Sequence, residues 1–167
     1  EKLMGALLAT RLKGFTPRHE RVTGDLELRE PRLVLGDLEV SGHLELKSDL
    51  FVFGNLTVGG LQRDTNSDYA NVVVGGDLVC GAGLLSEGML MVGGSLSAPL
   101  VALTFNQGFA KLLGGVKARL FFECDHGGTR VFGPLSASVI VFDELEADDE
   151  LEVVGLEAVF EQLAPSV

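Results

Sequence analysis

The chain has 167 residues, of which 46% are hydrophobic, and a formal net charge of −11. This apolar content is enough for one buried core and argues against a disordered chain. The acidity argues against nucleic acid and anionic membranes as partners, because both attract clustered Lys and Arg. With no membrane-spanning apolar run and no secretory leader pattern, we expect a cytoplasmic protein.

Residues 1–21 precede any repeat, and we expect them to form an N-terminal cap. In the stretch KLMGALLATRLK, residues 2–13, four leucines fall on one helical stripe. They are Leu3, Leu7, Leu8 and Leu12. A short helix here would cover the open strand edge at the first coil, although an apolar run this short also fits a strand.

A six-residue repeat begins after this cap. Residues 26–61 divide into LELREP, RLVLGD, LEVSGH, LELKSD, LFVFGN and LTVGGL. Alternation sends the first and third side chains of each six inward and the second outward, while the last two positions turn a corner. Three sixes close a coil of 18 residues. We therefore predict an all-β fold, a single-stranded parallel β-helix (β-solenoid) of about six to seven coils with short helical caps, over residues 22–160.

One apolar position recurs once per coil and should form a column inside the solenoid. It is occupied by Leu38, Leu56, Leu78, Leu96, Val116, Leu135 and Leu156, with spacings of 18, 22, 18, 20, 19 and 21 residues. Each spacing is one coil plus zero to four residues, and the extra residues can bulge from corners. Cys80 falls in a second inward column with Val58 and Ala98, so it should be buried.

Two polar stretches interrupt the repeat. Residues 61–71, LQRDTNSDYAN, read as an insertion loop, and residues 143–150, DELEADDE, as an acidic run whose simplest interpretation is a solvated face. Apolar residues 156–163 fit a further helical turn or two, and residues 161–167 are expected to form a C-terminal tail.

The residues eight to ten places after each column residue should stack at one corner, which we call the polar ledge. The candidate partner-binding residues there are Asp64, Asn66, Glu87, Phe105, Asn106, Asp125, His126 and Glu144. This ledge could bind a basic protein surface, with Phe105 as an apolar anchor. The alternative is that these corners are polar only because they turn in water.

No residue set for catalysis or metal binding is evident. Cys124, Asp125 and His126 are consecutive, so they point to alternating sides of a strand and cannot all converge on one ion. The two cysteines form neither a disulfide framework nor a Cys-x-x-Cys site. No Ser-His-Asp set, phosphate-binding glycine loop or zinc motif is present, so we expect no catalytic residues, no metal and no cofactor.

The phrases LVLGDLEV and VVVGGDLV resemble the repeat of bacterial polymer-forming β-helix proteins of the bactofilin type. This resemblance implies a short β-helix that assembles end to end through apolar terminal coils. The chain also looks similar to small acidic bacterial solenoids that serve as immunity partners of secreted toxins, which is an analogy at the level of the fold.

Three functions follow as hypotheses. The first is a non-enzymatic protein-binding solenoid, including an immunity-type protein that neutralises a basic partner. The second is a self-assembling scaffold. The third is a hexapeptide-type acyltransferase, since such enzymes and a zinc carbonic anhydrase family share the period of six. Their histidine patterns are not evident in His19, His43 and His126.

Overall fold

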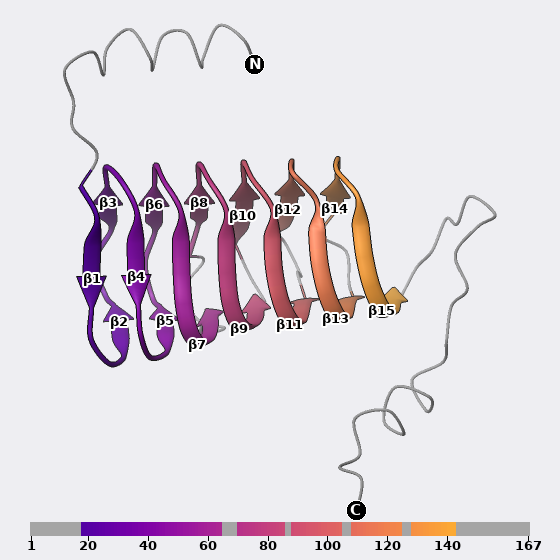
Figure 1. Cartoon of the computed structure of the whole chain (residues 1–167), viewed down its shortest axis with the longest axis horizontal. Helices are drawn as coiled ribbons and strands as arrows, with labels where there is room; N and C mark the ends of the chain where they lie inside the picture. Colours follow the sequence, from indigo (N-terminus) through magenta and orange to yellow (C-terminus); the bar gives the residue numbers. More distant parts are fainter. Residues whose placement is uncertain (1–17, 65–69, 86–87, 105–107, 125–127, 143–167) are drawn as a thin grey trace, which may run out of the picture.

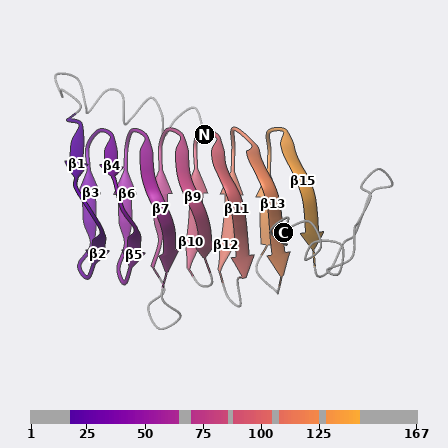
Figure 2. The same ribbon diagram turned by 60° about the horizontal axis from the view of Figure 1, so that its bottom comes forward.

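The computed structural model describes residues 18–64, 70–85, 88–104, 108–124 and 128–142. In these ranges the chain is a β-solenoid whose strands stack side by side along one axis (Figures 1 and 2). All strand pairings are parallel, and no helix occurs in the described part. The predicted fold class is confirmed. Of the expected N-terminal cap, residues 1–21, only residues 18–21 are described, and β1 begins within them at Glu20. The expected helical turns at residues 156–163 lie outside the described residues.

The first two coils contain three short strands each. They are β1 (Glu20–Val22), β2 (Leu26–Leu28), β3 (Arg32–Val34), β4 (Leu38–Val40), β5 (Leu44–Leu46) and β6 (Leu50–Val52). The first strand therefore starts two residues before the expected boundary of the solenoid at residue 22.

Later coils contain one long and one short strand. The long strands are β7 (Leu56–Asp64), β9 (Leu78–Leu85), β11 (Leu96–Thr104), β13 (Val116–Cys124) and β15 (Leu135–Phe142). The short strands are β8 (Val72–Val74), β10 (Met89–Val92), β12 (Phe109–Leu112) and β14 (Gly128–Val131). The long strands join a nine-stranded sheet with β1, β2, β4 and β5, while β3, β6, β8, β10, β12 and β14 form a six-stranded sheet.

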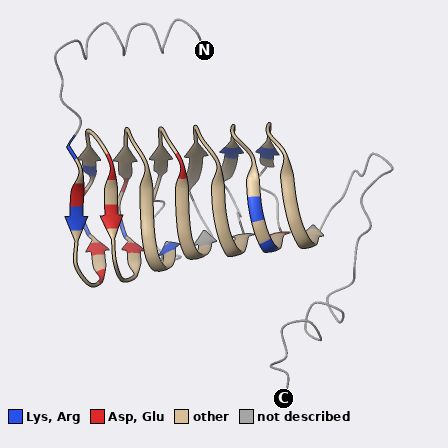
Figure 3. Ribbon diagram, viewed as in Figure 1, with Lys and Arg blue, Asp and Glu red and all other residues tan. Residues whose placement is uncertain are grey.

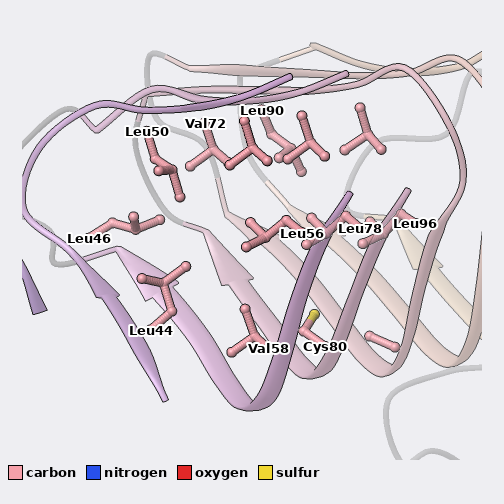
Figure 4. Close-up of a cluster of buried hydrophobic side chains, with 14 of the residues drawn as sticks. Leu44, Leu46, Leu50, Leu56, Val58, Val72, Leu78, Cys80, Leu90 and Leu96 are labelled. Carbon is pink, nitrogen blue, oxygen red and sulfur yellow. The ribbon is translucent and has the colours of Figure 1, made fainter. Parts of the chain in front are cut away.

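The predicted core column is present. Leu38 pairs with Leu56, Leu56 with Leu78, and Leu78 with Leu96, and the ladder continues through Val116 to Leu135. The column is buried from Leu38 to Val116, and Figure 4 shows its members Leu56, Leu78 and Leu96. Its last expected member, Leu156, lies outside the described residues.

The long strands arise where one corner loses its polar residue. In the second coil His43 turns this corner, and its Nδ1 accepts a hydrogen bond of 2.8 Å from the backbone N–H of Leu61. From Leu61 onward the corresponding positions are apolar: Leu61, Ala82, Leu100, Leu120 and Val139. Without a side-chain acceptor, the backbone of the later coils pairs with the next coil through the bend, as Leu100 does with Leu120.

The remaining corners are stabilised by ladders of side-chain acceptors. Asp37 Oδ1 accepts from the N–H of Asn55 at 2.7 Å, Asn55 Oδ1 from Asp77 at 2.8 Å, and Asp77 Oδ1 from Ser95 at 2.7 Å. Each acceptor satisfies a backbone donor of the following coil, which a turn would otherwise leave unpaired. The Asp or Asn that closes these sixes therefore joins successive coils.

Close stacking explains most corner glycines. Positive φ angles occur at Gly24, Gly88 and Gly115. At Gly75 and Gly93 φ is ordinary, but an added Cβ would overlap the carbonyl oxygen of the preceding coil, that of Phe53 and of Gly75 respectively. From the sequence, a corner glycine is expected to supply a positive φ angle. At Gly75 and Gly93, however, glycine is needed because the backbone of the neighbouring coil leaves no room for a Cβ.

Gln62 interrupts the otherwise apolar interior. It is fully buried on β7, between Leu44 and Gly83 in the pairing ladder, and neither its Oε1 nor its Nε2 has a hydrogen-bond partner. Cys80 is buried as predicted, and burial raises the pKa of its thiol to about 12.

Candidate interaction surfaces

The polar ledge can be located only by the strands that lead to it. The carboxyl ends of the long strands are in register, with Leu85 beside Leu103 and Thr104 beside Cys124. Asp64 is the last residue of β7. The other candidates, Asn66, Glu87, Phe105, Asn106, Asp125, His126 and Glu144, lie outside the described residues, so the ledge stays a prediction.

Metal-ligand clusters are absent from the ranges that the structure describes. No group of three His, Cys, Asp or Glu side chains there could hold an ion. Cys124 is half-buried at the end of β13, while Asp125 and His126 fall outside those ranges.

Ion pairs gather on the first three coils. The pairs are Arg21–Glu39, Arg29–Glu27, Arg32–Glu20, Lys47–Glu27, Lys47–Glu45 and Arg63–Glu45. Hydrogen bonds from Lys47 and Arg29 lower the pKa of Glu27 from its usual value. The side chains of these pairs are exposed or half-exposed, so solvent screens the pairs and they contribute little to stability. Acidic and basic segments lie side by side in these coils (Figure 3).

The last coils carry cations without ion pairs. Within the described part of the chain, none of Lys111, Lys117, Arg119 and Arg130 forms a salt bridge. Lys111 instead places its Nζ 5.2 Å from the ring centroid of Phe109. The solenoid therefore changes from paired charges at its amino-terminal end to unpaired cations at the other.

Most of the acidity lies outside the strands. The described ranges contain ten Lys and Arg against eleven Asp and Glu, so their charge is nearly balanced. Residues 143–167, the C-terminal segment, contain nine Asp and Glu and no Lys or Arg. The net charge of −11 therefore describes mainly this segment rather than the solenoid.

An apolar face is the strongest surface feature. Five of the six exposed large hydrophobic side chains in the described ranges lie on or directly after strands of the six-stranded sheet: Leu33 on β3, Phe51 on β6, and Phe53, Leu113 and Phe132 directly after β6, β12 and β14. We call this set the apolar face. Exposure reaches 62% for Phe132 and 58% for Leu33. The sixth residue, Val79, lies on the nine-stranded sheet.

Two of the parallel rows on the outer side of this sheet contain the apolar face. One row runs through Leu33, Phe51, Val73, Met91, Lys111 and Arg130. The other runs through Phe53, Gly75, Gly93, Leu113 and Phe132. The two central glycines therefore lie between larger apolar side chains.

Sequence reasoning missed the apolar face although a signal was present. Leu33 and Phe51 occupy the second, outward place of their sixes, where neighbouring repeats have Glu or Thr. Phe53 and Phe132 immediately precede corner glycines, in the phrases FGN and FGP. Large apolar residues at outward places indicate an exposed patch once the register is known.

In the described part of the chain no helix is long and apolar enough to cross a membrane. Comparison with protein-family models, curated proteins and solved structures found no match to this chain.

Proposed function

We propose that the chain is a non-enzymatic binding protein that docks a protein partner on the apolar face. The observation that supports this proposal is the concentration of exposed Leu and Phe side chains on one sheet. Soluble proteins expose single apolar residues everywhere, but several large ones along one side of a sheet, connected here by the half-buried Val73 and Met91, are typical of an interface. Aromatic residues are also enriched among those that contribute most to binding energy.

The layout of the face suits a partner with a particular chemistry. Apolar side chains of the partner would fill the space over Gly75 and Gly93, between Phe53 and Leu113. Lys111 and Arg130 line a shallow pocket at the carboxyl-terminal end of the face, together with Phe109 and Gly128. A partner carboxylate could bind these two cations, which have no acid of their own within the described residues.

The basic partner predicted from net charge would meet a different region. Because the described strands are nearly neutral, any attraction for a basic protein, including a toxin, arises mainly from the nine carboxylates of the C-terminal segment. A partner could use both regions. The apolar face then supplies affinity, and the acidic segment increases the rate of encounter.

Affinity capture from host extract with matched variants tests the proposal. A double variant, Phe51→Lys with Phe132→Lys, places two charges on the face and should lose the captured partner. Val79→Lys is the control, because Val79 is 44% exposed but lies on the other sheet. Recovery of the same protein by the double variant and by the unmodified chain would contradict the proposal.

Self-assembly is a second candidate, favoured by open strand edges. At the amino-terminal end β1, β2 and β3 each pair on one side only within the described part of the chain, which leaves backbone donors and acceptors available to another chain. Light scattering at rising protein concentration distinguishes this scaffold function from partner binding. A chain that remains monomeric throughout would exclude it.

A further inference from the structure

A second apolar cluster lies on the outer side of the nine-stranded sheet, at its carboxyl-terminal edge. It consists of Leu120 and Phe122 on β13 and of Val139 and Val141 on β15, and we call it the outer patch. It is separate from the core, because Phe121 and Ile140, the intervening residues, belong to the interior cluster. Strand alternation thus directs these four side chains outward.

Burial of the outer patch is anomalous for its position. Val139 and Val141 belong to the last strand of the sheet, yet they are only 5% and 8% exposed. Leu100 and Leu120 lie in the same outward row on β11 and β13, with strands on both sides, and are only half-buried. Neighbouring strands alone therefore do not account for the burial of the two valines.

We propose that the outer patch is the docking site of the chain's own C-terminal segment, residues 143–167. Chain connectivity supports this choice, because the segment starts directly after Phe142. Val139 is three residues before that point, about 10 Å along the strand. The eight residues 143–150 can span up to about 26–29 Å, so the later residues reach the patch with length to spare.

The composition of the segment matches the surface that it would cover. Its later part supplies apolar side chains: Leu151, Val153, Val154, Leu156, Val159, Phe160 and Leu163. Its nine carboxylates would meet a surface that has Lys117 and Arg119 near Leu120 on β13, both exposed and, among the described residues, without an ion pair. Apolar contact and charge attraction therefore act together.

Thiol labelling of the full-length chain tests this docking. Val141→Cys introduces a thiol in the outer patch, and Val79→Cys provides an exposed reference on the same sheet. The thiol at position 141 should react with maleimide at least about ten-fold more slowly than the one at position 79, because reaction requires the cover to open first. Peptide mass spectrometry separates this labelling from that of Cys80 and Cys124. Equal rates at the two positions would overturn the proposal.

Substitutions in the segment identify what covers the patch. Adding Phe160→Asp and Leu163→Asp to Val141→Cys should bring its labelling rate close to that of Val79→Cys. Lys117→Glu with Arg119→Glu should also accelerate labelling, whereas Lys111→Glu, on the other sheet, should not. Protection that persists in the Asp variant, or that increases with protein concentration, would assign the patch to another cover or to a second copy and overturn the proposal.

Discussion

Replacement of Gln62 by Leu should stabilise the protein. Both polar atoms of this amide are buried without a hydrogen-bond partner, and an unsatisfied buried polar group costs about 1–3 kcal/mol. Leu44, the adjacent residue in the same inward ladder, shows that the column accepts leucine. Because both atoms of the amide are unsatisfied, we take the upper end of this range, about 3 kcal/mol. Allowing about 1 kcal/mol for imperfect repacking, we expect a net gain of about 2 kcal/mol in the free energy of unfolding.

Chemical denaturation followed by circular dichroism measures this gain. For a domain of this size, about 2 kcal/mol corresponds to a rise of about 4–8 °C in Tm. Gln62→Glu is the size-matched control and should be strongly destabilising, because it places an ionisable group in the same apolar site. If Gln62→Leu were neutral or destabilising, the amide would have to be hydrogen-bonded in solution, for example to a water beside Gly83, and the reasoning would fail.

Three further predictions concern the core and the corners. Gly75→Ala should destabilise by about 1–3 kcal/mol because its Cβ would overlap the carbonyl oxygen of Phe53. Gly83→Ala, whose Cβ would lie 3.6 Å from Cys80 Sγ, should stabilise by about 1 kcal/mol; the opposite order in thermal melts would refute the stacking. Burial raises the pKa of the Cys80 thiol from 9.0 to about 12. The free energy that this thiol contributes to folding is therefore fully present below its pKa in the unfolded chain, and it is lost as the pH rises toward its pKa in the folded chain. Stability should therefore fall by about 1.4 kcal/mol per pH unit above about pH 9, and denaturation of Cys80→Ala should lack that component.

The repeat made the fold predictable because it acts on every coil. A period of six with two inward residues fits a stacked strand, and the column from Leu38 to Leu135 follows from counting alone. The merging of strands from β7 onward was not predicted. Strands merge because the later coils lack the side-chain acceptor that His43 supplies in the second coil. This role of His43 is visible only in the structure, where its side chain accepts a hydrogen bond from Leu61.

The surfaces were harder to predict than the core because they depend on context. The outward place of a six carries no packing constraint, so Phe51 looked like an ordinary variation until its neighbours Leu33 and Val73 were aligned beside it. Net charge was misleading for a related reason. It sums over the whole chain, whereas the carboxylates of residues 143–167 are separated in sequence from the nearly neutral strands.

Because of the ladder of corner acceptors, the solenoid can change its length by whole coils. Asp37, Asn55 and Asp77 each accept from the coil that follows, so equivalent donors and acceptors occur at the three steps from Asp37 to Ser95. Excision of residues 38–55 would join Asp37 to Leu56 and place the N–H of Asp77 over the Asp37 carboxylate, with the same type of bond restored. Descendants of this sequence can thus grow or shrink by whole coils, about 4.8 Å at a time, while both ends keep their own chemistry.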